Sequence, residues 1–299
     1  MNSANVFHHL GDLAWQALLD EVNLTPKPGL VDRRNSGAHQ DMALDDFYRS
    51  AAAIRPWLPR FIAYGFAATP LAAGKWPAGL RELGIACERE MFRATYGVNT
   101  HKGSVFALGL LCCALGMILS RQQIPTPERL CQQVAYLCRG LTERELHNDP
   151  RRETAGQRLF HLYGLGGARA EAESGFATVL HIGLPAYRQA LGGGMSRQES
   201  LLTALLSLMR VNADTNVVAR GGLAGLSWLQ QYAADFLERG GLAQPDAIPQ
   251  LQRFDRHCIA RHLSPGGSAD LLVVTRFLEF FPVQAIPLIA HDKIRSEVC

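Results

Sequence analysis

Residues 104–119 read SVFALGLLCCALGMIL and form the most apolar stretch of the chain, between Lys102 and Arg121. The run has 16 residues, which is fewer than the roughly 20 that an α-helix needs to cross a bilayer. Leu and Ala dominate it, and no polar side of a helix can be drawn through it. We therefore predict a helix over 104–121 that is buried in the core of a globular protein.

Outward from this run, the chain contains further stretches that are rich in Leu and Ala at helical spacing. Val and Ile do not alternate with polar residues over any length that would indicate a strand. No repeat or low-complexity linker divides the chain. We predict a mostly α, single-domain multi-helix fold over 1–281, with the active site built from inter-helix loops and with 282–299 an unassigned tail. Besides 104–121, the expected helices are 6–22, 77–95, 127–139, 197–211, 223–239 and 268–281.

Composition narrows the class of protein. The chain has 299 residues, a formal charge of +3, 47% hydrophobic residues and 19% charged residues. This composition is typical of a globular protein with a substantial core, and the small charge gives no reason to expect nucleic acid as a partner. Residues 1–10 lack the basic start and apolar run of a signal peptide. We expect a soluble cytoplasmic protein with no membrane segment.

The cysteines support the same compartment. Their number is odd and no C-x-x-C pair is present, so neither a zinc site nor dithiol chemistry is indicated. We expect all but the terminal cysteine to be small buried residues in a reducing cytoplasm. The seven are Cys87, Cys112, Cys113, Cys131, Cys138, Cys258 and Cys299.

Two glycine-bounded loops stand directly before predicted helices. In 264–270, SPGGSAD, the residues Gly266 and Gly267 let the backbone approach a ligand, and Ser268 is the expected N-cap. Free N–H groups at a helix start favour a phosphate, although an ordinary capped turn has the same sequence. In 97–103, GVNTHKG, the polar residues are Asn99, Thr100, His101 and Lys102. Lys102 offers a point charge to phosphate and His101 a proton donor, unless the loop is simply a polar surface turn.

Further charged residues lie in the remaining loops. Lys27 stands between two prolines, which predicts a stiff extended loop carrying one cation or a rigid connector with a solvated lysine. Asp32, His39 and Asp41 follow, but the spacing of the last two is weak evidence for a metal. Arg169, Glu171 and Glu173 are expected to begin a helix, where first-turn glutamates suit the helix dipole. Asp214 follows an apolar helix, so it needs a partner such as Mg²⁺ or Arg220.

The order of these motifs resembles the triphosphoribosyl-dephospho-CoA synthase family. The resemblance covers residues from about 21 to 281 and departs from the expected pattern at Ala170, where we expect glycine. A methyl group there would crowd the backbone near Arg169 and Glu171. The motifs are VNLTPKPGLVDR with GAH-x-DM, then MFRATYGVNTHKG, GARAEAESGF, DTNVVARGG and LSPGGSADLL.

This resemblance implies a transferase that binds ATP and 3′-dephospho-CoA. The 2′-hydroxyl of dephospho-CoA attacks C1 of the ATP ribose, adenine leaves, and a separate transferase loads the product on the acyl carrier protein of citrate lyase. Direct attack inverts the carbon and gives an α linkage. A sister branch makes the same compound for malonate decarboxylase, but GAHQDMALDDF and GLSWLQQ favour the citrate lyase branch.

The chemistry asks for three groups of residues. We expect Asp214 and Asp270 to hold Mg²⁺. The residues expected to bind substrate are Lys27, Asn99, Thr100, Lys102, Arg169, Arg220, Gly266, Gly267 and Ser268. Asp32, Glu88 or Glu171 would stabilise positive charge at the ribose or take the hydroxyl proton. Glu88 is equally well explained as a solvated helix residue. His101 is the candidate acid for adenine.

Two other classes remain open from the residues alone. A helical metal-dependent phosphohydrolase needs several His and Asp ligands on facing helices. Here His39, His101, His147 and His161 are scattered, and the His291–Asp292 pair is in the tail. A nucleotide-binding or carrier-protein-binding module without catalysis would explain the glycine turns but not the number of carboxylates in the loops.

Overall fold

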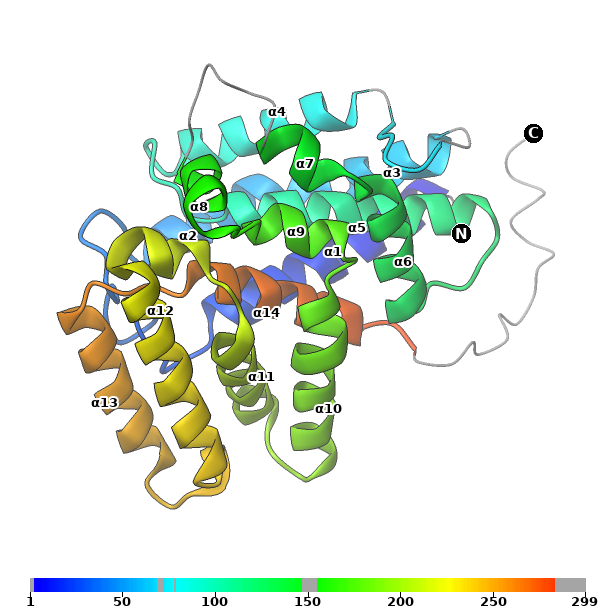
Figure 1. Cartoon of the computed structure of the whole chain (residues 1–299). Helices are drawn as coiled ribbons and strands as arrows, with labels where there is room; N and C mark the ends of the chain where they lie inside the picture. Colours follow the sequence, from blue (N-terminus) through cyan, green and yellow to red (C-terminus); the bar gives the residue numbers. More distant parts are fainter. Residues whose placement is uncertain (1–2, 69–71, 78, 147–154, 283–299) are drawn as a thin grey trace.

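The computed structural model describes residues 3–68, 72–77, 79–146 and 155–282, and within them every regular element is a helix (Figure 1). The α-helices are α1 Ser3–Val22, α2 Leu44–Ile54, α3 Leu58–Ala67, α4 Leu80–Ala94, α5 Lys102–Ser120, α6 Pro127–Cys138, α7 Leu141–Leu146, α8 Ala155–Tyr163, α9 Gly167–Glu173, α10 Leu184–Gly192, α11 Arg197–Val211, α12 Thr215–Glu238, α13 Ala247–Ala260 and α14 Gly266–Glu279. Short irregular turns of helix cover Arg55–Trp57, Val179–Gly183 and Gly241–Ala243.

Helix α5 occupies the middle of the molecule (Figure 1). All of its residues from Ala107 to Ile118 are buried, because α1, α3, α4, α6, α9 and α14 pack around it. In the described part of the chain, α5 is the one helix that is long and apolar enough to cross a membrane, and most of it is buried inside the protein. The expected buried core helix is confirmed.

Helices α3 and α5 approach each other closely because glycines replace side chains at their contact. A Cβ at Gly65 of α3 would lie 1.9 Å from the carbonyl oxygen of Cys113. A Cβ at Gly116 of α5 would lie 2.0 Å from the carbonyl oxygen of Ile62. Only glycine fits at these two positions, so the backbones themselves form the contact.

A second set of helices, α10 to α13, extends from this core on one side (Figure 1). Helix α14 joins the two sets, because it packs against α1 and α5 as well as against α10, α11 and α12. The first turn of α14 therefore lies where both sets meet, and this position matters for the site described below.

The predicted helices agree with the observed ones to within three residues at each end, with one exception. The helix expected at 223–239 begins eight residues earlier, at Thr215. It consists of two helical segments divided at Gly222, whose φ of 64° and ψ of −171° are not helical. Glycine adopts this positive φ without a Cβ clash. The helical pattern in the sequence predicted the segment after Gly222 but not the segment before it.

Two predictions about helix starts are wrong. Ser268 is not an N-cap, because α14 already begins at Gly266 after Pro265. Glu173 is the last residue of α9, so it does not lie in a first turn. Instead its carboxylate accepts hydrogen bonds from the backbone N–H groups of Gly140, at 2.6 Å, and Thr142, at 2.9 Å. Glu173 thus caps the start of α7 from a distance in sequence.

Six of the observed helices are not predicted from the sequence, namely α2, α3, α7, α8, α10 and α13. These helices are short, at 6 to 14 residues, and propagate only a few turns. Pro59 and Pro185 lie in the first turns of α3 and α10, a position that suits proline although it hides the helix from a periodicity search. Short helices of this kind depend on tertiary packing more than on propensity.

The cysteine prediction is confirmed for the six cysteines in the described residues, which are all buried and free. Cys299 and the tail from residue 283 onward lie outside the described residues, as does His147.

The close contact of α3 and α5 yields a prediction about stability. We expect Gly116→Ala to lower the free energy of unfolding by about 1–3 kcal/mol, because the added methyl forces the two backbones apart. The control is Gly84→Ala in α4, where a Cβ meets nothing within 4 Å and should add about 0.5–1 kcal/mol of helix stability. Urea unfolding of both variants measures the effect. Equal midpoints would show that the contact tolerates a side chain.

Candidate functional site

The loops singled out in the sequence meet at one cavity of about 370 Å³. Each of the five motifs contributes residues to its wall, although the motifs are spread over more than 240 positions of the chain. The polar residues on the wall are Glu21, Lys27, His39, Asn99, Thr100, His101, Lys102, Ser104, Arg169, Glu171, Asn212, Asp214, Thr215, Asn216, Arg220, Ser264 and Asp270.

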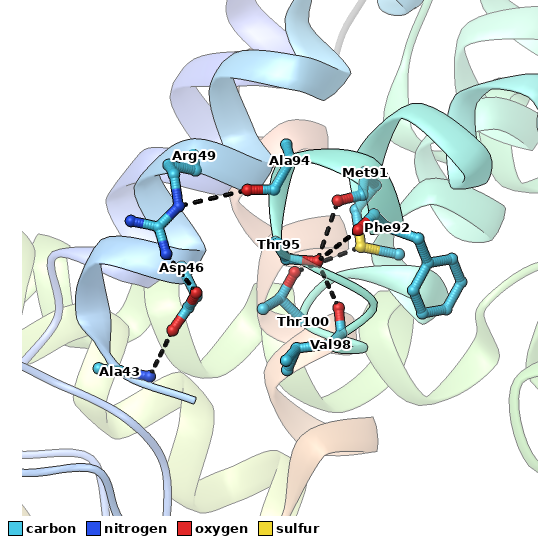
Figure 2. Close-up of polar contacts among 9 residues, drawn as sticks. All are labelled: Ala43, Asp46, Arg49, Met91, Phe92, Ala94, Thr95, Val98 and Thr100. Atoms are coloured by element: carbon cyan, nitrogen blue, oxygen red, sulfur yellow. Dashed lines mark hydrogen bonds and ion pairs between the residues drawn. The ribbon is translucent and has the colours of Figure 1, made fainter. Parts of the chain in front are cut away.

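The turn before α5 is held rigidly (Figure 2). The hydroxyl of Thr95 lies 3.0 Å from the carbonyl oxygen of Met91 and 2.6 Å from that of Val98. Arg49 of α2 donates to the carbonyl oxygen of Ala94 at the end of α4. These contacts fix the direction in which residues 99–102 enter the cavity wall.

His101 directly precedes α5 and is 2% exposed. Its Nδ1 lies 2.6 Å from the hydroxyl of Ser50, whereas its Nε2 has no partner in the described residues although it is buried. Burial, together with the charge of Lys27, lowers the pKa of His101 to about 3. The imidazole is therefore neutral near pH 7. It can exchange a hydrogen bond with a ligand, but it does not deliver a proton as the imidazolium that we expected.

Lys27 is 1% exposed and forms an ion pair with Glu21, at the end of α1. Its Nζ donates to Glu21 Oε1 at 2.6 Å and to the Glu21 carbonyl oxygen at 2.9 Å. A buried charge is stable only when it is paired in this way. Lys27 thus presents a fixed positive charge to the cavity, and Glu21 is a site residue that the sequence reasoning missed.

Asp270 of α14 reaches the first turn of α5. Ser104 Oγ donates to its Oδ1 at 2.5 Å, and a Cβ on Gly103 would lie only 1.9 Å from its Oδ2. Burial raises the pKa of Asp270 to about 7, and the negative charges of Glu21 and Asp214 add to this effect. The glycine of the THKG motif is therefore required for this carboxylate to approach the helix.

Asp214 is the N-cap of α12 and ties it to α14. Its Oδ1 accepts hydrogen bonds from the N–H groups of Asn216 and Val217, at 3.0 and 3.4 Å. Its Oδ2 accepts from Ser268, at 2.8 Å from the N–H and 3.1 Å from the hydroxyl. These four bonds fill the acceptor sites of a carboxylate. Arg220 is not among these partners, and the metal role of Asp214 stays a prediction.

The residues of the SPGGSAD turn have two different roles. Gly266 and Gly267 line the cavity, and a Cβ on Gly267 would lie 3.0 Å from the carboxylate of Asp214. Ser268 is fully buried, and its N–H is taken by Asp214. The N–H and the hydroxyl of Ser268 are thus both committed to Asp214, and its role in substrate binding stays a prediction.

Arg169 and Glu171 both line the cavity from α9. Arg169 Nε donates to Glu145 Oε2 at 2.8 Å. Glu171 Oε1 accepts from Thr178 at 2.5 Å, whereas its buried Oε2 has no partner in the described residues, and burial raises the pKa of its carboxyl. The methyl of Ala170 is accommodated because residue 166 is glycine, where a Cβ would lie 2.5 Å from that of Ala170.

The structure brings together a serine and a histidine that are far apart in sequence. His39 Nε2 lies 2.8 Å from Ser264 Oγ, and Arg220 Nη2 lies 3.2 Å from His39 Nδ1. Arginine can only donate, so Nδ1 is the acceptor and Nε2 carries the proton toward Ser264. Burial and Arg220 also lower the pKa of His39. In this tautomer His39 does not accept the Ser264 proton, so Ser264 is not an activated nucleophile.

Two predicted catalytic carboxylates lie off this cavity. Asp32 Oδ2 accepts from the hydroxyl of Thr25 and the N–H of Lys27, and its Oδ1 accepts from the N–H of Arg34, at 2.7 to 3.0 Å. Asp32 therefore folds the loop that carries Lys27. Glu88 lines a neighbouring cavity and lies 3.5 Å from Nζ of Lys102, so neither carboxylate faces the ribose site that we expected.

Comparison with known proteins identifies the family of this chain. A family model described as ATP:dephospho-CoA triphosphoribosyl transferase matches residues 7–285. The chain belongs to this transferase family. A relative from Citrobacter koseri, named probable 2-(5''-triphosphoribosyl)-3'-dephosphocoenzyme-A synthase, is 56% identical over 266 residues, covering 89% of this chain and 88% of the relative. No solved structure matches the chain.

For this triphosphoribosyl transferase family member, several site residues had no sequence signal of their own. Ser50, Glu145 and Asn212 reach the cavity or its ion pairs from segments without a recognisable motif. Asp255 of α13 accepts hydrogen bonds from Gly29 N and Asn35, which fixes the loop after Lys27. Glu21 and Ser104 could have been found, since both directly flank quoted motifs.

The structural role of Asp214 generates a prediction. We expect Asp214→Asn to lower the free energy of unfolding by about 2–4 kcal/mol, since an amide NH₂ would face backbone donors that now bind a carboxylate. Urea unfolding measures the effect, with Asp41→Asn, an exposed aspartate, as the control. An Asp214→Asn variant of normal stability that needs more Mg²⁺ for activity would instead make Asp214 a metal ligand.

The buried neutral state of His101 generates a prediction about pH. In the unfolded chain His101 binds a proton near its usual pKa of 6.5, whereas in the folded chain it binds one only near a pKa of about 3. The free energy of unfolding should therefore fall as the pH drops below 6.5, by up to about 1.4 kcal/mol per pH unit from this residue. We expect His101→Gln to have a shallower decline between pH 6.5 and 4.5 in urea unfolding. Parallel curves would show that His101 is protonated in the folded protein.

Proposed function

We propose that this protein transfers the triphosphoribosyl group of ATP to the 2′-hydroxyl of 3′-dephospho-CoA and releases adenine. The product is 2′-(5″-triphosphoribosyl)-3′-dephospho-CoA. The observation that carries this proposal is the family match over 7–285, together with the convergence of all five motifs on one cavity. A binding module without catalysis would not belong to a transferase family.

In this proposal, the positively charged side chains and the glycine turn of the cavity bind the triphosphate. Lys27, Lys102 and Arg169 each stand in an ion pair, and Arg220 contacts carbonyl oxygens and His39. Charge-assisted hydrogen bonds from such groups suit phosphate oxygens. Asn99, Thr100, Gly266 and Gly267 complete the polar wall on the proposed phosphate path.

Mg²⁺ is the cofactor that we propose with ATP. Carboxyl groups on the cavity wall face the same space as the cations, and a divalent ion would join the triphosphate to them by neutralising phosphate oxygens. Asp270 fits this role, because it faces the cavity and is less committed than Asp214. Mg²⁺ sites commonly use one or two carboxylates plus phosphates, so a larger ligand cluster is unnecessary.

The chemical step is a substitution at C1 of the ATP ribose. The bond from that carbon to N9 of adenine breaks while a bond to the 2′-oxygen of dephospho-CoA forms. Glu171, whose Oε2 is buried without a partner, takes the proton of the hydroxyl. His101 Nε2–H donates a hydrogen bond to the departing adenine. The adenine then takes a proton from water, and the hydroxide that is left takes the proton that Glu171 has accepted.

A single displacement is favoured over a covalent intermediate. In the contact between Ser264 and His39 the histidine proton is directed at Ser264, so His39 does not activate that hydroxyl. Ser50, which contacts Nδ1 of His101, does not line the cavity. Direct attack on the face opposite adenine inverts the carbon, as it does in inverting glycosidases. The β configuration of ATP would therefore give an α linkage in the product.

Downstream, we propose that a separate transferase loads the product on the acyl carrier protein of citrate lyase. The segments GAHQDMALDDF and GLSWLQQ are the residues that favour this branch over the malonate decarboxylase branch. A metal-dependent phosphohydrolase receives no support, since the described residues contain no group of three or more His, Cys, Asp or Glu suited to a metal ion.

The decisive experiment incubates the purified protein with ATP, Mg²⁺ and 3′-dephospho-CoA. We expect free adenine and a triphosphoribosylated product in equal amounts, both abolished by a chelator. Chromatography measures adenine, and NMR of the isolated product assigns the new anomeric centre, which should be α. Inorganic phosphate in place of adenine would identify a hydrolase. A β linkage would exclude single displacement and direct attention to Glu171 as a covalent nucleophile.

A further inference from the structure

A second cavity, of about 280 Å³, adjoins the first. Five residues line both cavities, namely Lys102, Gly103, Phe106, Ala168 and Arg169. The first turn of α5 and the start of α9 thus form the boundary between them. The two cavities are thus neighbours that share one stretch of wall.

The wall of the second cavity is mainly apolar. Phe61 of α3 and Val105 and Leu110 of α5 form one side. Trp76 and Ile85 stand on the other, and Ile85 is 55% exposed. Such a surface suits a ligand group that carries methyl and methylene groups.

The charged groups on this wall are already matched with one another. Lys102 pairs with Glu88, and Glu145 pairs with both Arg169 and Arg81. The two guanidinium groups lower the pKa of Glu145, although burial opposes them. A second polyphosphate would have to break these pairs, whereas an uncharged chain with amide groups would not. Glu88 and Glu145 also offer acceptors to amide N–H groups.

The proposed reaction brings two nucleotides to one place. A cavity of about 370 Å³ is near the lower end of the roughly 300–1,000 Å³ range for a single drug-sized ligand. The triphosphate, both riboses and the reacting atoms already need this polar space. The remainder of the acceptor therefore has to lie outside it.

We propose that the second cavity binds the pantetheine arm of 3′-dephospho-CoA. The inference rests on the proposed function and extends it to the acceptor. The diphosphate of the acceptor stays in the first cavity with the other phosphates, and the uncharged arm runs along Phe106 into the apolar space. The second cavity thus selects an acceptor in which the phosphates are followed by a neutral chain.

The adenine of ATP is the rival occupant, and the geometry is against it. Trp76 is the largest aromatic side chain on this wall, and the guanidinium of Arg81 lies over its ring, 5.1 Å from the centre. Arg81 is held there by its ion pair with Glu145. A base would have to displace this cation, whereas a flexible chain can pass beside it.

Gly84 allows a sharp test, because it lines the second cavity from within α4 and a Cβ there meets nothing within 4 Å. Gly84→Leu starts from a Cβ with open space around it, should place apolar atoms in the cavity, and should also favour the helix. The matched control is Gly192→Leu in α10, where a Cβ also meets nothing within 4 Å and which lines neither cavity. Thermal melting verifies that both variants fold.

Calorimetry then measures the dissociation constants of 3′-dephospho-CoA and of ADP, which lacks the arm. We expect Gly84→Leu to weaken dephospho-CoA binding by roughly tenfold or more, with ADP and ATP binding within about twofold of wild type. Ile85→Glu, at a mostly exposed position, should act in the same direction. Unchanged dephospho-CoA binding in both variants would overturn the proposal, and so would a loss confined to ATP or shared equally with ADP.

The adenine-release assay keeps this inference separate from the proposed function. Wild-type protein that releases no adenine would reject the proposed function. Wild-type protein that turns over, combined with a Gly84→Leu variant of unchanged KM for dephospho-CoA, would reject the second cavity alone. The expected outcome is a raised KM for dephospho-CoA with an unchanged KM for ATP.

Discussion

A helix without a polar face has to be enclosed on every side, and α5 imposes this constraint on the whole molecule. Six other helices pack around it, and two of them bring a glycine or a carboxylate within contact of its backbone or its first turn. At its N-terminal end, His101 and Lys102 line the cavity together with residues of the first turn of α14. The position of the cavity is therefore a consequence of how the core is covered.

The site is built from charges that already have partners. Lys27 with Glu21, Arg169 with Glu145, and Lys102 with Glu88 hold their side chains in place before any ligand arrives. Preorganised groups of this kind lose little freedom on binding, so more of the interaction energy remains available to the ligand. The unpartnered atoms, His101 Nε2 and Glu171 Oε2, are the exceptions and face the same space.

The long apolar helices and the glycine-bounded loops could be predicted because their signals are local: periodicity, caps and turn residues. The partners of the loop residues could not. In the sequence, Asp214 is a carboxylate without an evident partner after a helix. Only the fold shows that the N–H of Ser268, 54 positions later, donates a hydrogen bond to it. Asp32 likewise acts within its own loop, and Ser264 meets His39 across 225 positions. A motif indicates that residues gather, but not which of them face the ligand.

The buried cysteines have a consequence for the chemistry of a CoA-type substrate, which ends in a thiol. Burial raises the pKa of Cys87, Cys113, Cys131 and Cys138 to about 12, and it also raises the pKa of Cys112 and Cys258. Thiol–disulfide exchange requires an accessible thiolate. These six, which are the cysteines of the described residues, supply none, so none of them becomes covalently joined to a thiol-bearing molecule or to its oxidised disulfide.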